Sequence, residues 1–307
     1  MPGLSSPVSA PLPGLTLTPR YNEMARLGWT RNRSLAAGHA VLFGYIVTAR
    51  HMDGTVLKSF TFLPLPLLLS VLAGCAGSRQ EIAYQCRASN YRGIVFAVDG
   101  AGGFEATSAA LRNVIDQAGM PLRVESVYWS HGYGRFFADQ MDWAHARVEG
   151  SRLAAQVANW RAANPTCDVY LLGHSAGSAV VLAAGEALPA DHVKRIVLLA
   201  PSVSTDYDIR PALRSASDGV DVFFSQRDVF YLGFGVAVVG TVDRWFSPAA
   251  GRTGFRPTLQ SNDDIVLYQR LHQHPWHPSV EWTGNYGGHY DAYQPAYLRS
   301  YVLPLFN

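Results

Sequence analysis

The chain has 307 residues, of which 48% are hydrophobic and 16% are charged, and its formal net charge at pH 7 is +2. Residues 1–51 contain five arginines and one glutamate, a net charge of +4, so residues 52–307 sum to −2. The excess of basic charge therefore belongs to the N-terminal segment, and nothing in the charge distribution indicates binding of nucleic acid.

An apolar run at residues 60–72 follows Lys58 and ends at Ala73-Gly74-Cys75. It is shorter than the roughly 20 residues that a membrane-spanning helix needs and has the length of a signal-peptide core. The ending Leu72-Ala73-Gly74-Cys75 resembles the lipobox of bacterial lipoproteins. The resemblance implies that Cys75 is lipidated and begins the mature protein, on the periplasmic side of the cell envelope, with the outer membrane preferred because Ala76 follows. The alternative is a buried apolar segment that ends in a cysteine by chance.

An export signal belongs at the N-terminus, so we expect translation to start at Met52, or at Val56 or Leu57. Residues 1–51 are then not made, or are disordered. Residues 52–74 form the signal peptide, and residues 75–307 form a single domain of a size that supports a full core. Cys86 and Cys167 each precede an expected strand, and the two would pair in an oxidising periplasm if those strands are neighbours.

Strand and helix patterns alternate from residue 94 onward. The expected strands are 94–98, 123–128, 168–172, 194–199, 220–225 and 279–282, and the expected helices are 106–118, 147–163, 175–187, 208–216 and a final one at 294–303. This alternation predicts an α/β protein with a parallel, doubly wound sheet. Residues 196–200 are continuously apolar, as expected of a strand covered on both faces.

The sequence Gly173-His174-Ser175-Ala176-Gly177 ends one of these strands and opens a helix-like segment. A serine hydroxyl becomes a nucleophile when a rigid turn presents it and a base takes its proton. The small residues on either side permit such a tight strand-to-helix turn. We therefore predict that Ser175 is a nucleophile.

An acid and a base are expected to follow, each after a later strand. Asp228 lies in the turn after the expected strand 220–225, and His289 lies in a glycine-rich loop after the expected strand 279–282. The alternatives for the base are His131 and His174. The alternatives for the acid are Asp206, Asp208 and Asp291, of which Asp291 is expected to cap the last helix.

Two backbone N–H groups are needed to bind the oxyanion, one of them from the residue after the nucleophile. Strand 94–98 is followed by the glycine-rich loop 99–104, which can approach a substrate closely. We expect the donors to be Ala176 together with Ala101 or Gly102. Asp99, at the head of the loop, is expected to fix it through hydrogen bonds.

These motif positions, in this order, resemble the α/β-hydrolase superfamily of serine esterases, lipases and related enzymes over most of residues 90–307. The resemblance implies an α/β-hydrolase fold, a mostly parallel central sheet of about six strands with helices on both faces. It also implies cleavage of carboxylic esters, of small molecules or lipids, by a Ser-His-Asp triad that requires no metal or organic cofactor. The same triad would serve a thioesterase, an amidase or a peptidase, and a non-catalytic envelope lipoprotein on this fold is a further alternative. The sequence does not indicate an oligomeric state.

Two longer excursions, 129–147 and 229–278, interrupt the alternation and are candidate lids rich in aromatic residues. Those residues either line an acyl pocket or pack in the core. His272, His274 and His277 are spaced like a metal-binding tract, but prolines lie between and after them with no patterned carboxylate nearby. We interpret them as ordinary loop histidines.

Overall fold

The computed structural model describes residues 91–228, 240–243 and 247–307, and the backbone of residues 39–42, 45–52 and 55–62. Chain contacts divide the protein into two units, Met1–Leu72 and Ala73–Asn307. In the first unit, β1 (His39–Leu42), β2 (Tyr45–Met52) and β3 (Thr55–Phe62) form an antiparallel sheet in that order. The predicted lipidation site Cys75 and the predicted disulfide partner Cys86 lie outside the described residues.

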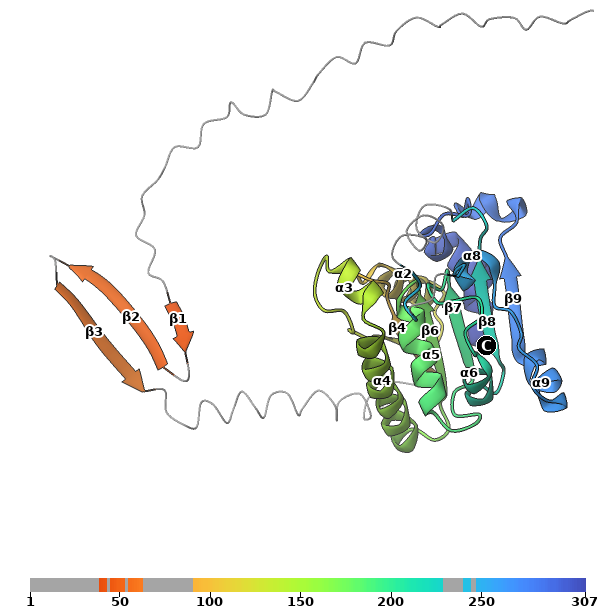
Figure 1. Cartoon of the computed structure of the whole chain (residues 1–307), viewed down its shortest axis with the longest axis horizontal. Helices are drawn as coiled ribbons and strands as arrows, with labels where there is room; N and C mark the ends of the chain where they lie inside the picture. Colours follow the sequence, from red (N-terminus) through yellow and green to blue (C-terminus); the bar gives the residue numbers. More distant parts are fainter. Residues whose placement is uncertain (1–38, 43–44, 53–54, 63–90, 229–239, 244–246) are drawn as a thin grey trace, which may run out of the picture. The chain divides into compact units, whose positions relative to one another are not determined.

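The second unit is built on a six-stranded sheet with the order β5-β4-β6-β7-β8-β9, in which every neighbouring pair is parallel (Figure 1). The strands are β4 (Gly93–Val98), β5 (Leu122–Ser126), β6 (Asp168–His174), β7 (Arg195–Leu199), β8 (Val220–Phe224) and β9 (Leu271–Pro275). Because all strands run in one direction, their carboxyl ends meet at one edge, where ligands of such sheets bind.

Helices cover both faces of this sheet. The main ones are α2 (Ala106–Gln117), α3 (Phe136–Met141), α4 (Trp143–Ala163), α5 (Gly177–Ala187) and α6 (Arg210–Ser215). Shorter ones are α8 (Ala250–Thr253), α9 (Asn262–Leu267), η2 (Tyr268–Arg270), η3 (Pro278–Thr283), η4 (Asp291–Tyr293), α10 (Pro295–Tyr297), η5 (Leu298–Val302) and η6 (Leu303–Phe306).

Alternate residues of each strand enter different cores, because successive side chains point to opposite faces. In β4, Ile94 and Phe96 pack with α4, α5 and α6, whereas Val95 packs with α2 and the C-terminal elements. Both sets are fully or almost fully buried. The sheet is therefore covered on both faces, which explains its continuously apolar strands.

The predicted elements are confirmed up to β8, with ends shifted by a few residues. The predicted last strand at 279–282 is wrong, because that segment is the 3₁₀ helix η3 and the sixth strand is β9. The predicted single helix at 294–303 is also wrong. It is divided into a short α-helix, a π-turn and a 3₁₀ turn that contains Pro304, a residue with no N–H for an α-helical hydrogen bond.

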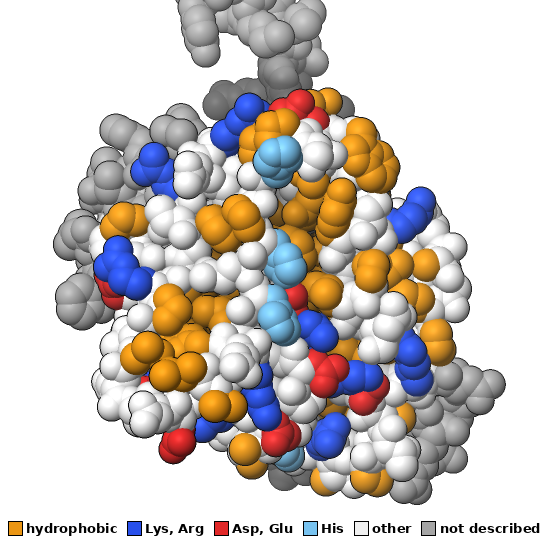
Figure 2. All heavy atoms as spheres, turned by 90° about the vertical axis from the view of Figure 1, so that its right-hand side faces the viewer, with side chains coloured by type: hydrophobic (Ala, Val, Ile, Leu, Met, Phe, Trp, Pro, Cys, Tyr) orange, Lys and Arg blue, Asp and Glu red, His pale blue; other side chains and the backbone are white. Residues whose placement is uncertain are grey.

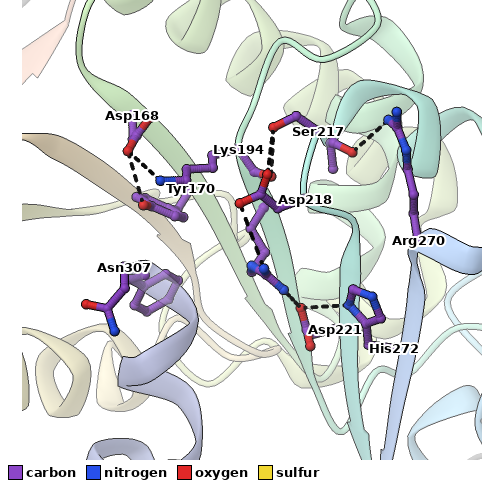
Figure 3. A network of polar contacts seen from close by, with 12 residues as sticks. Asp168, Tyr170, Lys194, Ser217, Asp218, Asp221, Arg270, His272 and Asn307 are labelled. Carbon is purple, nitrogen blue, oxygen red and sulfur yellow. Dashed lines mark hydrogen bonds and ion pairs between the residues drawn. The ribbon is translucent and has the colours of Figure 1, made fainter.

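A buried carboxylate attaches β9 to the sheet (Figure 3). Asp221 of β8 is almost fully buried, and its oxygens lie 2.5 Å from Arg195 Nη1, 2.7 Å from His274 Nε2 and 3.5 Å from His272 Nδ1. Burial alone would raise the pKa of Asp221, but the hydrogen bonds from His274 and Arg195 outweigh it and hold the pKa below its ordinary value. The Asp221 carboxylate thus stays ionised and binds the two histidines of β9.

The histidines at 272 and 274 are therefore strand residues rather than loop residues, which corrects our interpretation. Figure 2 shows histidine side chains exposed beside acidic and basic groups on the face that carries this edge of the sheet. Within the part of the chain that the structure describes, no group of three or more His, Cys, Asp or Glu side chains could hold a metal ion. In the same part, no helix has the length and apolarity to span a membrane.

Candidate active site

The turn between β6 and α5 presents Ser175 in a strained backbone conformation. Its φ is 52°, in the left-handed region that residues other than glycine rarely adopt. A Cβ on Gly177 would lie 2.3 Å from the carbonyl oxygen of Asp99, and one on Gly173 would lie 2.8 Å from Cα of Ser178. The two glycines are thus required by close backbone contacts, and the turn is the tight one that the motif predicts.

Three predicted residues come together at the carboxyl ends of the strands. His289 Nε2 lies 2.8 Å from Ser175 Oγ, and His289 Nδ1 lies 2.6 Å from Asp228 Oδ2. Since a carboxylate only accepts, the Nδ1 proton faces Asp228, and Nε2 can accept the serine proton. All three side chains are at least nine-tenths buried. The geometry is that of a nucleophile, a base and an orienting acid.

The loop before the histidine is braced by Asp291. Its Oδ2 accepts the N–H groups of Tyr286 at 3.0 Å and of Gly288 at 2.8 Å. The prediction that Asp291 caps the last helix is therefore wrong, since its carboxylate is turned back towards the loop that presents His289. This role was not visible in the sequence, because it depends on the loop folding back over the first turn of η4.

His174, which precedes Ser175 in the chain, contacts the backbone of His289. Its Nε2–H donates to the backbone carbonyl of His289 at 3.2 Å. Burial, and then the nearby imidazole of His289, lower the pKa of His174 to about 3, so this ring is neutral at ordinary pH. His174 therefore supports the backbone of His289, whose ring is the one that contacts Ser175 Oγ.

The backbone amide of Ala176, which follows Ser175, and those of Gly100 and Ala101 in the loop 99–104 donate no hydrogen bond within the described part of the chain. The Gly100 backbone approaches the nucleophile closely, since a Cβ there would lie 3.1 Å from Cβ of Ser175. The amide of Gly102, in contrast, donates to Asp139 Oδ2 at 2.7 Å. Of the two donors expected from this loop, Gly102 thus has a partner within the protein, and Ala101 stays a prediction.

Asp99 fixes the start of the same loop, as expected. Its Oδ1 accepts the N–H of Thr107 at 2.7 Å and that of Ser108 at 3.2 Å, and its carbonyl accepts from the indole of Trp129 at 2.8 Å. Burial raises the pKa of the Asp99 carboxyl, although the hydrogen bonds from Ser108 and Thr107 oppose the rise. The residue therefore ties the loop to the start of α2 and to the first excursion.

The residues weighed as alternatives have other partners: Asp206 pairs with Arg256, Asp208 with Arg210, and His131 with Asp139. In the first excursion Trp129 is a core residue, whereas Tyr133, Phe136 and Phe137 are exposed. The aromatic residues of the second excursion, at 230, 231, 234, 245 and 246, lie outside the described residues.

The parallel sheet with helices on both faces, and the strand-turn-helix that carries Ser175, define an α/β-hydrolase fold, as expected. The chain is also similar in sequence to one family, described as serine aminopeptidase, S33, whose model matches residues 130–269. No curated protein sequence matches the chain.

Several solved structures are similar at low sequence identity. The catalytic core domain of acetyl xylan esterase from Trichoderma reesei is 15% identical, with 69% of this chain and 98% of that chain covered and a TM-score of 0.38. A lipase-esterase related protein from Clostridium acetobutylicum is 10% identical, with 71% and 96% covered and a TM-score of 0.41. A cutinase-like protein from Cryptococcus sp. is 13% identical, with 71% and 97% covered and a TM-score of 0.38.

Proposed function

We propose that this protein is a serine hydrolase that cleaves carboxylic esters through an acyl-enzyme. The proposal is carried by one observation, the buried hydrogen-bond chain from Ser175 through His289 to Asp228 beside the amides of Ala176 and Ala101. A nucleophile, an oriented base and two donors for an oxyanion are the parts that acyl transfer needs.

In the proposed reaction, Ser175 Oγ attacks the ester carbonyl carbon while Nε2 of His289 takes the hydroxyl proton. The developing oxyanion accepts hydrogen bonds from Ala176 and Ala101. The bond to the leaving oxygen then breaks, and His289 returns the proton to the departing alcohol. Water, deprotonated by the same imidazole, releases the acid and restores the serine. Asp228 keeps the Nδ1 proton in place and stabilises the imidazolium.

The surroundings favour an uncharged ester over a peptide with a free amino terminus. An aminopeptidase needs a carboxylate to bind the substrate ammonium group. In the described loops of the site, Asp99, Asp139 and Asp228 each already accept hydrogen bonds from the protein itself. Each of these carboxylates is therefore already engaged in holding the loops of the site or the His289 imidazole.

Aromatic side chains beside the glycine-rich loop 99–104, which we call the oxyanion loop, also favour an uncharged substrate. The rings of Phe104 and Tyr133 meet edge to face at a centroid distance of 4.7 Å, and Phe104 lies 5.3 Å from the ring of Phe136. All three are partly or largely exposed. An apolar rim of this kind suits an uncharged acyl or alcohol group.

The test compares 4-nitrophenyl acetate and butyrate with the matching thioester and 4-nitroanilide. We expect the ester to be cleaved with the highest kcat/KM, and Ser175→Ala and His289→Ala to lose on the order of 10⁴-fold or more. Ser217→Ala removes an exposed serine hydroxyl outside the site and should leave the rate unchanged. Preferred cleavage of the anilide would favour the amidase or peptidase alternative. A folded wild-type protein that cleaves none of the substrates would favour a non-catalytic role.

The proposal extends to location. We infer from the lipobox-like Leu72-Ala73-Gly74-Cys75 that the precursor is cleaved before Cys75 and anchored to the envelope membrane by lipid on that residue. Mass spectrometry of the membrane-bound protein should find acyl chains on an N-terminal Cys75. A soluble Cys75→Ser variant is expected, and membrane attachment that survives this change would contradict the inference.

A further inference from the structure

The first excursion carries a buried carboxylate that the proposed reaction does not use. Asp139, in α3, is fully buried and accepts four hydrogen bonds. Its Oδ2 lies 2.7 Å from Gly102 N and 2.6 Å from Ser130 Oγ. Its Oδ1 lies 2.8 Å from His131 N and 2.9 Å from His131 Nδ1. A carboxylate so saturated is held in one orientation.

The contact with Gly102 falls on the oxyanion loop itself. The carbonyl of Gly102 is held as well, because it accepts the N–H of Gly134 at 2.8 Å. The peptide groups on both sides of Gly102 are therefore fixed by the first excursion, at a φ of 97° that favours glycine. The preceding residue is Ala101, the proposed oxyanion donor.

The next residue of α3 reaches the opposite side of the site. Gln140 Nε2 donates to Ser202 Oγ at 2.8 Å and to the carbonyl of Gly240 at 3.2 Å. The N–H of Ser202 in turn donates to the carbonyl of Ser175 at 3.1 Å. Two consecutive residues of α3 thus connect the oxyanion loop to the backbone of the nucleophile.

We propose that Asp139 is the positioning residue of the oxyanion site: by holding Gly102, it directs the amide of Ala101 towards the substrate carbonyl. The inference rests on the proposed function. The excursion that carries Asp139 is then a fixed brace of the site, and the Gly102 amide is excluded as an oxyanion donor.

The charge state of Asp139 agrees with this role. Burial alone would raise the pKa of Asp139, but the hydrogen bonds from Ser130, Gly102 and His131 outweigh it and hold the pKa below its ordinary value. The carboxylate therefore stays ionised, as it must in order to accept from four donors.

Two substitutions of Asp139 distinguish its effect on the position of the Gly102 amide from its effect on the stability of the folded protein. Asp139→Ala removes the acceptor from Gly102. Asp139→Asn is the milder change, since its amide oxygen can still accept from Gly102, although its NH₂ then faces the backbone N–H of His131 as well as the ring. Asp142→Asn is the matched control, because this half-exposed neighbour of His131 caps α4 and asparagine caps as well.

The kinetic readout is kcat and KM for 4-nitrophenyl acetate per active site, with sites counted by a fluorophosphonate. Losing an oxyanion donor costs about 10²- to 10³-fold in kcat, so a misplaced donor in Asp139→Ala should cost about 10- to 100-fold with KM little changed. Asp139→Asn, which keeps an acceptor for Gly102, should lose less kcat than Asp139→Ala, and Asp142→Asn should match the wild type. Affinity for a trifluoromethyl ketone, which forms a tetrahedral adduct with serine, should fall in parallel with kcat/KM.

A second readout does not depend on activity. Hydrogen exchange of the Gly102 amide should be slow in the wild type, faster in Asp139→Ala and intermediate in Asp139→Asn. Unchanged kcat per site in Asp139→Ala, or a Gly102 amide that exchanges freely in the wild type, would overturn the role of Asp139. If Asp139→Ala does not fold, Ser130→Ala should still lower kcat and speed this exchange, and no change in either would overturn it. A wild type that cleaves no ester and forms no adduct would instead overturn the proposed function, and the positioning role with it.

Discussion

The backbone strain at Ser175 has a measurable consequence for stability. We predict that Ser175→Gly is more stable than Ser175→Ala, although both variants lack the hydroxyl and are inactive. The comparison isolates the backbone because neither side chain can bond to His289, and only glycine adopts a φ of 52° without a steric cost.

The size of this stability difference depends on the hydrogen bonds that hold the backbone of Ser175. The N–H of Ser175 donates to Leu199 at 3.0 Å, and its carbonyl accepts from Ser178 and Ser202 at 3.1 Å each. With both backbone groups held, an alanine at this position cannot relax to a negative φ. The left-handed conformation costs a residue with a Cβ roughly 1–2 kcal/mol, and the greater unfolded-state entropy of glycine offsets about 0.5–1 kcal/mol of this. We expect a net difference of about 1 kcal/mol.

Urea unfolding monitored by tryptophan fluorescence measures this difference, with equal m-values required for the comparison. In thermal unfolding, 1 kcal/mol corresponds to about 2–4 °C in Tm for a domain of this size. Ala183→Gly, in the buried interior of α5, is the control of opposite sign, because its backbone is helical and glycine is unfavourable there. Equal stability of the two Ser175 variants, or a more stable Ser175→Ala, would refute the argument from strain.

Three further predictions concern the surroundings of the nucleophile. Because the unfolded chain binds a proton at His174 near pH 6.5 and the folded chain resists it until about pH 3, stability from this group is present above pH 6.5 and lost as the pH falls. The loss between pH 7.5 and 5.5 should be about 1.4 kcal/mol, and it should be absent in His174→Gln in urea titrations at the two pH values. Gly173→Ala places a Cβ 2.8 Å from Ser178 and should lower stability by about 1–3 kcal/mol with loss of esterase activity; a Tm equal to that of wild type would contradict the packing. Asp228→Asn should lower kcat on the order of 10⁴-fold with little change in Tm, and a small effect on kcat would mean that Asp228 does not orient His289.

The central strands and the three residues that meet at Ser175 could be predicted because each has a local signal. The buried strands are continuously apolar, the turn at Ser175 needs glycines on both sides, and Asp228 and His289 come later in the chain in the order that the resemblance implies. These features depend on a few neighbouring residues, so the sequence displays them directly.

The sixth strand could not be predicted, because β9 has the sequence Leu-His-Gln-His-Pro and no apolar pattern. It pairs as an edge strand through its backbone, and its histidines bind Asp221, which lies 53 positions before His274 in the chain. Residues 279–282 have the better strand composition, but Pro278 begins a 3₁₀ helix there.

Asp139 was missed for a similar reason. Its carboxylate lies in no motif, and the donors that surround it come from Gly102, Ser130 and His131, which only the folded chain brings together. The contact between Asp139 and Gly102 also distinguishes Gly102 from Ala101, the two oxyanion donors between which the sequence could not choose. The sequence shows a flexible glycine-rich loop, whereas the partner that selects one amide of that loop comes from a separate excursion.

The central claim is that Ser175 is an activated nucleophile. It is tested most directly by incubating the folded protein, beginning at Cys75, with a fluorophosphonate and locating the adduct by peptide mass spectrometry. We predict a single adduct on Ser175 that is lost in His289→Ala and strongly slowed in Asp228→Asn. Labelling at another residue, or none on the folded wild-type protein, would contradict the claim.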